Sequence, residues 1–231
     1  MISVVIPALN EARNLKGLLR SLEGEGVAHE IIVADGGSTD GTANVAKYLG
    51  ARVIRTAPGR GLQLAEGAKR ARGEILLFLH ADSVFPAGGL RAVERALARD
   101  PDTPGGNFRL LFDGDDGFSR WLDGFYAWIR ARGVYYGDSA PFVRRSVYQR
   151  LGGIRPIALM EDFDFVSRME KAGPTCCIHD PPLITSSRRF QGRRPAAIVL
   201  GWLWIHGLFL LGVGPDRLAR IYDSKRRRRA A

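Results

Sequence analysis

The chain is organised around an apolar run at residues 75–79 that ends abruptly in a polar cluster at residues 80–83. A short apolar run bounded by turn residues is typical of a strand buried on both faces of a parallel sheet. In open α/β sheets, ligands bind beyond the carboxyl ends of such strands. Asp82 lies at that position, where a carboxylate either holds a hard divalent cation or only closes a turn.

Similar apolar runs alternate with helical patterns over residues 1–100. Further buried strands are expected at 2–6, 30–34 and 52–54. Helices are expected from residue 10, through 45–48 with Asp40 as N-cap, from 60, and from about 89 to 99. This alternation predicts an α/β protein with a single, mostly parallel, doubly wound sheet of Rossmann-like units.

The pattern changes after Pro101. Residues 106–112 alternate like a half-exposed strand, and an aromatic helix at 118–128 follows. We expect its rings in the core rather than in a binding platform, because buried aromatic side chains are common. The expected domain is completed by a turn at 137–138, helices at 147–151 and from 161, and two short strands near 177 and 184.

Residues 196–214 are uncharged and strongly apolar, with His206 as the exception, and basic residues stand on either side. Three interpretations remain: an interfacial helix lying in the membrane plane, a core or dimer helix, and a true span. Trp202 and Trp204 favour the interfacial helix, which predicts peripheral membrane contact and suits a lipid or hydrophobic acceptor. We therefore divide the chain into a domain at 1–190 and a C-terminal helical segment with a basic tail at 191–231.

The composition of the chain bears mainly on its expected cellular location. The net charge is +10, and residues 225–229 supply half of it, so the body is only modestly basic and suits an anionic ligand without requiring one. The two cysteines, Cys176 and Cys177, are adjacent and form no disulfide framework. With no recognisable signal peptide, a cytoplasmic location is expected, and membrane contact would place the protein at the inner face.

Acidic residues fall at four strand or loop ends, namely Asp35, Asp82, Asp138 and the pair at 161–162. The first two are expected at the same edge of the sheet, because parallel strands end together, and this favours a ligand crevice. Arg60 stands between glycines before a helix, a position that suits a phosphate. Each acid also has a plain structural interpretation, as a helix cap or as a partner of the helix dipole.

The chain lacks the sequence motifs of several classes of nucleotide-binding protein. The chain has no Walker A sequence and no Gly-x-Gly-x-x-Gly after the first strand, which argues against P-loop and nicotinamide proteins. A nucleotidyltransferase would need a Gly-rich basic loop after that strand, and residues 7–11 offer none. A non-catalytic nucleotide-sugar binding protein remains an alternative. The arginine tail favours nucleic acid only weakly, and no nucleic-acid partner is expected.

Five pieces of the chain, taken in order, resemble the family 2 glycosyltransferases with the GT-A fold. They are residues 4–11, 35–42, 59–61, 79–82 and 161–162, within a match to about residues 1–190. The arsenosugar-type subset of the family looks closer still. Its features here are residues 79–82, 136–138, 142–145 and 160–162. That label names a gene context rather than a substrate.

The resemblance implies a donor site for a nucleotide-diphosphate sugar, with a UDP-sugar favoured, and a Mg²⁺ or Mn²⁺ cofactor. Pro7, Asn10 and Glu11 would line the nucleotide pocket. Asp35 would bond the base, and Arg60 would flank the base and the diphosphate. Asp82 would bind the divalent cation.

The resemblance also implies an inverting reaction in which Asp162, paired with Glu161, is the general base and Asp138 orients the acceptor. Arg188 and Arg189 resemble the basic part of a motif that normally ends in Trp.

Three positions depart from the family pattern. Phe190 stands where that motif has its Trp, and Gly36 stands where Asp-Asp-Gly-Ser has its second Asp. His80 replaces the first Asp of Asp-x-Asp, where it would serve the donor site as a metal ligand or as a spacer at the end of the strand.

Overall fold

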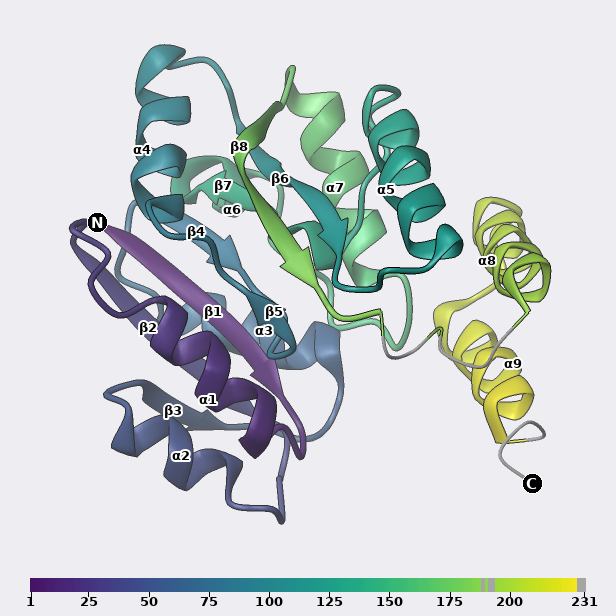
Figure 1. Cartoon of the computed structure of the whole chain (residues 1–231), viewed down its shortest axis with the longest axis horizontal. Coiled ribbons are helices and arrows are strands. Elements are labelled where there is room, and N and C mark those ends of the chain that lie inside the picture. Colours follow the sequence, from purple (N-terminus) through teal and green to yellow (C-terminus); the bar gives the residue numbers. More distant parts are fainter. Residues whose placement is uncertain (188–189, 191–193, 228–231) are drawn as a thin grey trace.

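The computed structural model of the protein describes residues 1–187, 190 and 194–227, with side chains described as far as 222. Its strands form a single sheet flanked by helices on both faces (Figure 1). The strands are β1 (Ile2–Ala8), β2 (His29–Asp35), β3 (Arg52–Arg55), β4 (Ile75–Phe78), β5 (Ser83–Val84), β6 (Gly105–Phe112), β7 (Phe142–Arg144) and β8 (Cys176–Thr185). The helices are α1 (Ala12–Ser21), α2 (Thr42–Tyr48), α3 (Arg60–Arg70), α4 (Gly89–Arg99), α5 (Gly117–Arg130), α6 (Arg145–Arg150), α7 (Glu161–Ala172), α8 (Pro195–Leu210) and α9 (Pro215–Arg227), and a 3-10 turn, η1, spans Gly137–Ser139.

The sheet order is β3-β2-β1-β4-β7-β6-β8-β5. The pairs β3–β2, β2–β1, β1–β4 and β6–β8 are parallel, whereas β7 and β5 run antiparallel to their neighbours. This arrangement confirms the predicted mostly parallel, doubly wound sheet. Two details were wrong: the two short strands expected near 177 and 184 are one continuous strand, β8, and β6 is buried along most of its length.

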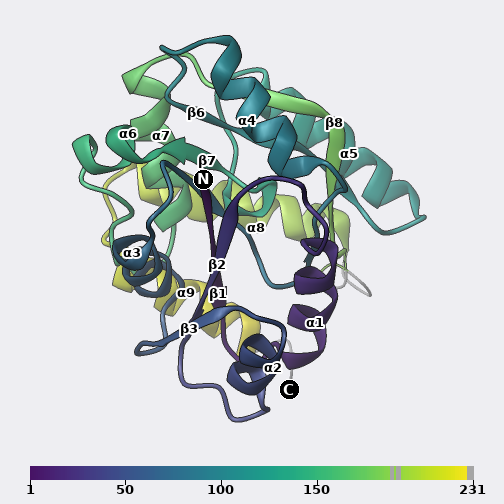
Figure 2. The same cartoon turned by 90° about the vertical axis from the view of Figure 1, so that its left-hand side faces the viewer.

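The alternation of side chains along β1 divides the core into two layers. Val4 and Ile6 pack on one face, in the cluster that holds the buried side chains of α1, α4 and α5. Val5 packs on the other face, in the cluster that holds those of α3, α6 and α7. Figure 2 shows these two sets of helices on opposite sides of the sheet. Both faces of β1 are therefore covered, which explains its continuous apolar sequence.

The aromatic residues of α5 do not all lie in the core, so the prediction for this helix was wrong in part. Leu122, Tyr126 and Ile129 are buried, whereas Trp121 is 46% exposed and Trp128 is 54% exposed. The helix carries two apolar stripes, and the stripe of Leu122, Tyr126 and Ile129 is the one that faces the sheet. The other stripe lies on its outer side.

The apolar C-terminal segment forms α8, which ends at Leu210. Only Ile198 and Ile205 of this helix are buried, so it attaches to the domain along a narrow line. Among the helices of the described residues, none combines the length and the hydropathy needed to cross a bilayer. The division of the chain at residue 190 stays a prediction.

Candidate functional site

Asp35 and Asp82 leave the sheet at the same edge. Strands β2 and β4 pair with β1 from its two sides, and both run parallel to it. Asp35 lies opposite Ala8 in this register, and the Leu79 N–H, just after β4, donates to the Val5 carbonyl at 3.0 Å. The Asp35 side chain is buried and that of Asp82 is half-buried.

The loops after β1 and β2 are joined by hydrogen bonds through Asn10. The Asn10 N–H donates to the Ser38 hydroxyl at 2.9 Å, and the Asn10 side-chain oxygen accepts from the Thr39 N–H at 2.9 Å. The carboxylate of Asp35 accepts from the Ser38 N–H at 3.1 Å. The two predicted nucleotide-site residues Asn10 and Asp35 therefore share one loop cluster. Pro7 belongs to β1, which continues two residues beyond the strand expected at 2–6.

The start of α1 is tied to the start of α2 in the same region. The Glu11 N–H donates to the Thr42 hydroxyl at 2.9 Å. The Asp40 carboxylate accepts from the Ala12 N–H at 3.0 Å and from the Thr42 N–H at 3.1 Å, so it serves the first turns of both helices. Asp40 was predicted to be the N-cap of α2, but that position is taken by Gly41, whose φ of 87° suits glycine.

Gln63 of α3 supports the same edge of the sheet and was not predicted from the sequence. Its buried amide nitrogen donates to the carbonyls of Ala8 at 2.8 Å and Ala34 at 2.7 Å, and so ties the ends of β1 and β2 to α3. A Cβ at Gly36 would lie 3.1 Å from the Gln63 amide. This contact gives a physical reason for glycine where the family pattern has its second Asp. A glutamine on the buried face of an amphipathic helix was the available signal.

Arg60, at the start of α3, meets the start of α7. Its guanidinium forms an ion pair with Glu161 and a second one with Asp162 at 3.4 Å. We call these three residues the Arg60 cluster. Burial raises the pKa of Glu161, and the charge of Arg60 opposes that shift. The Arg60 cluster thus brings together three of the predicted site residues from elements distant in the sequence.

The carboxylate of Asp162 is held in one orientation by backbone donors. Its Oδ2 accepts from the Gly137 N–H at 2.9 Å, and its Oδ1 accepts from the Phe163 N–H at 2.8 Å. Burial by itself would raise the pKa of Asp162, but Arg60 and these two N–H groups outweigh it, and the pKa is lowered. Asp162 is therefore ionised at neutral pH.

His80 and Asp138 lie beside Asp162. A Cβ at Gly137 would be 3.1 Å from both the His80 Nε2 and the Asp162 Oδ2, so the two side chains converge on this glycine. Burial, and then the nearby Arg60, lower the pKa of His80, so its imidazole is neutral at pH 7. The buried Asp138 accepts a hydrogen bond from the Tyr126 hydroxyl of α5 at 3.1 Å. This tyrosine was not among the predicted site residues.

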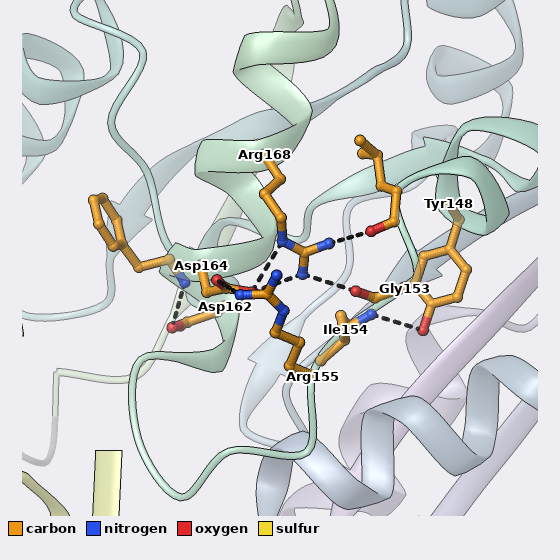
Figure 3. Close-up of polar contacts among 9 residues, drawn as sticks. Tyr148, Gly153, Ile154, Arg155, Asp162, Asp164 and Arg168 are labelled. Carbon is orange, nitrogen blue, oxygen red and sulfur yellow. Dashed lines mark hydrogen bonds and ion pairs between the residues drawn. The ribbon is translucent and has the colours of Figure 1, made fainter. Parts of the chain in front are cut away.

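A polar network around Arg168 fixes the loop that leads to α7 (Figure 3). The Arg168 guanidinium donates to the carbonyls of Leu151 at 2.6 Å and Gly153 at 2.8 Å, and it pairs with Asp164 at 2.7 Å. Arg155, in the same loop, pairs with Asp164 from the other side at 3.0 Å. The loop and the first turn of α7, which carries Asp162, are therefore held as one unit.

The approach of α3 to this loop depends on Gly61. A Cβ at this position would lie 2.9 Å from the carbonyl oxygens of both Arg155 and Ile157. We expect Gly61→Ala to lower the free energy of unfolding by about 1–3 kcal/mol, because the two close atoms belong to the backbone and cannot move aside as the end of a flexible side chain can. Urea denaturation measures this. Gly17→Ala, at an exposed helix position with nothing within 4 Å, is the matched control and should be neutral or stabilising. Equal stabilities for Gly61→Ala and the wild type would contradict this packing.

The carboxylate at the end of β4 suits a divalent cation that is held mainly by the phosphates of a bound substrate. Within the described residues, no group of three or more His, Cys, Asp or Glu side chains forms a complete metal site. Mg²⁺ is usually bound through one or two carboxylates together with substrate phosphates and water. Asp82, half-buried after β4, offers such a carboxylate. Arg188 and Arg189, the other predicted donor-site residues, lie outside the described residues.

The fold is that of the GT-A glycosyltransferases. Staphylococcus aureus TarS superposes with a TM-score of 0.67 at 16% identity, over 90% of this chain and 39% of that one. The mannosyltransferase PcManGT from Pyrobaculum calidifontis, in complex with GDP-Man and Mn²⁺, superposes with a TM-score of 0.67 at 19% identity, over 97% of this chain and 68% of that one. The chain belongs to glycosyl transferase family 2, whose family model matches residues 3–145.

Relatives of known activity match a part of the chain. Glucosyl-3-phosphoglycerate synthase of Mycobacterium tuberculosis is 35% identical over 96 residues, which are 37% of this chain and 30% of the relative. The 4,4'-diaponeurosporenoate glycosyltransferase of Staphylococcus haemolyticus is 38% identical over 107 residues, 42% of this chain and 28% of the relative. Each match thus spans less than a third of the relative's length. The arsenosugar-type subset stays a prediction.

Proposed function

We propose that the protein is an inverting glycosyltransferase that moves a sugar from a nucleotide-diphosphate sugar to an acceptor hydroxyl and depends on Mg²⁺ or Mn²⁺. The observation that carries this proposal is the Arg60 cluster, which joins a cation and a fixed carboxylate in a chain of glycosyl transferase family 2. A UDP-sugar is the favoured donor.

The donor would lie across the loop cluster at the ends of β1 and β2. Asp35 would bond the base, Pro7, Asn10 and Glu11 would line the nucleotide, and Arg60 would meet the diphosphate. Asp82 would hold the Mg²⁺ or Mn²⁺ ion that neutralises the charge developing on the diphosphate leaving group. His80, kept neutral by burial, adds no positive charge of its own next to that ion.

Asp162 would act as the general base on the acceptor. Its carboxylate takes the proton of the acceptor hydroxyl as that oxygen bonds the anomeric carbon and the bond to the diphosphate breaks. Arg60 lowers the pKa of Asp162. A bound diphosphate competes for Arg60, so the pKa of Asp162 rises and the carboxylate becomes a stronger base once the donor is in place. Glu161 would keep Arg60 within reach of both partners.

The acceptor would enter beside α8. His206 of this helix packs edge-to-face on Phe163 with ring centroids 4.4 Å apart, and its Nδ1 lies 3.2 Å from the Tyr136 hydroxyl. Tyr136 and Phe163 directly adjoin Gly137 and Asp162 in the sequence, so α8 borders the proposed base. Asp138 would orient the acceptor, and the apolar surroundings favour a hydrophobic one.

Thermal-shift measurements with UDP-, GDP- and dTDP-sugars test the proposal. One donor class, at about a hundred times its Kd, should raise Tm by roughly 5–10 °C when Mn²⁺ is present, since a ligand that binds only the folded state stabilises it. The same donor should be hydrolysed slowly without an acceptor. Binding without hydrolysis or transfer would identify a non-catalytic binder. Pyrophosphate release from a nucleoside triphosphate and a sugar phosphate would identify a nucleotidyltransferase instead.

A further inference from the structure

The outer side of α5 carries a continuous stack of aromatic rings. Phe118, Trp121, Phe125 and Trp128 follow one another with centroid distances of 5.7, 5.0 and 6.2 Å and nearly parallel planes. The guanidinium of Arg132 closes the stack, 3.8 Å from the Trp128 ring. Phe118 and Phe125 are partly buried against the core, whereas Trp121 and Trp128 are 46% and 54% exposed, so the two tryptophan rings present apolar area to solvent.

The buried ring of Phe190 connects the stack on α5 to α8. Phe190 packs on Phe118 at 6.1 Å and on Trp202 of α8 at 5.4 Å, so it bridges the two helices. Both helices lie at the end of the molecule remote from α2 and β3 (Figure 1). The exposed apolar residues of α8 and its C-terminus are Leu200, Leu203, Trp204, Leu210 and Leu211. We call this combined surface of α5 and α8 the aromatic face.

Positive charge surrounds the aromatic face. Its exposed arginines are Arg120 and Arg132 around α5, Arg194 before α8, and Arg217 and Arg220 on α9. Over residues 191–231 the sequence holds nine basic and two acidic residues. Asp113 and Asp115 are exposed at the N-terminal end of α5, where Asp116 caps the helix by accepting from the Phe118 and Ser119 N–H groups. Asp216, in the first turn of α9, is also exposed. The surface is therefore apolar in the middle and largely basic at its edges.

We propose that the aromatic face docks on an anionic membrane surface, with α8 lying in the plane of the interface. Tryptophan rings prefer the headgroup region, and basic residues add attraction to anionic lipids. A helix of 16 residues is about 24 Å long, shorter than the roughly 30 Å hydrocarbon core. A second copy of the chain is disfavoured as the occupant, because two such faces would bring like charges together. Docking goes beyond the proposed function and requires no donor chemistry.

Flotation of the full chain with vesicles tests the docking. Vesicles of phosphatidylcholine with about 30% phosphatidylglycerol should bind the protein at least about tenfold more strongly than phosphatidylcholine alone, and high salt should reduce the difference. The double variant Trp121→Ala, Trp128→Ala should lose about tenfold or more in partitioning, since both exposed rings are removed. The matched control is Tyr48→Ala on α2, where the ring is 90% exposed but lies outside the aromatic face; it should bind like the wild type.

Two outcomes overturn the proposal. One is equal partitioning of the wild type and the double variant, or no preference for anionic vesicles. The other is a concentration-dependent dimer, seen by light scattering, that the double substitution abolishes, since a second copy would then cover the aromatic face. Circular dichroism of the double variant confirms that it is folded. A protein that binds vesicles but shows no donor-dependent rise in Tm would leave docking standing and remove the proposed function.

Discussion

Asp162→Asn should reduce kcat by about 10³-fold, while the Kd for the donor stays within about threefold. The amide keeps the size of the side chain and one acceptor for the backbone N–H groups of Gly137 and Phe163, but it cannot take a proton. Single-turnover kinetics give the rate of transfer, and calorimetry with the nucleoside diphosphate and Mn²⁺ gives the affinity.

The matched control for this substitution is Asp164→Asn, the same chemical change two residues further along α7. Asp164 pairs with Arg155 and Arg168, so its loss should lower Tm but leave kcat within a few-fold of the wild type. A kcat for Asp162→Asn that equals the wild-type value would remove Asp162 from the role of base.

Asp82→Asn should abolish the dependence of donor binding on Mn²⁺ and lower kcat/KM by about 10²–10³-fold, since a cation on the leaving group contributes several kcal/mol. The rise of Tm with donor and Mn²⁺ should shrink to the value without metal, a readout that requires no turnover. Asp102→Asn, at an exposed loop position after α4, is the matched control and should behave as the wild type. A variant at Asp82 that keeps its full response to Mn²⁺ would place the ion elsewhere.

The strands of the first half were predictable because their environment is simple. Strands buried on both faces, such as β1 and β4, need apolar residues at every position, and that pattern is visible without any tertiary information. The same reasoning placed Asp35 and Asp82 at one edge of the sheet, since parallel strands end together. β8 was harder to predict, because Pro181 and Pro182 interrupt its pattern, while the pairing with β6 continues past them through a shift of register.

The partners of the site residues could not be predicted, because they arise from tertiary packing. Nothing near Asp138 in the sequence points to Tyr126, which α5 brings in from the far end of β6. The burial of the aromatic side chains of α5 was predicted wrongly in part for a related reason. The exposed and the buried stripe of this helix both have helical spacing, so periodicity alone does not say which stripe faces the sheet. Gln63 lies on a buried helix face, where its role appears only once β1 and β2 are in place.

The most direct test of the proposed site is anomalous diffraction from crystals soaked with UDP and Mn²⁺. We predict a single manganese peak at about 2.2 Å from a carboxylate oxygen of Asp82 and from oxygens of the diphosphate, with Arg60 turned toward the phosphates and Asp162 across the site from them. A manganese ion bound away from Asp82, or a diphosphate out of reach of Arg60, would contradict the proposed mechanism.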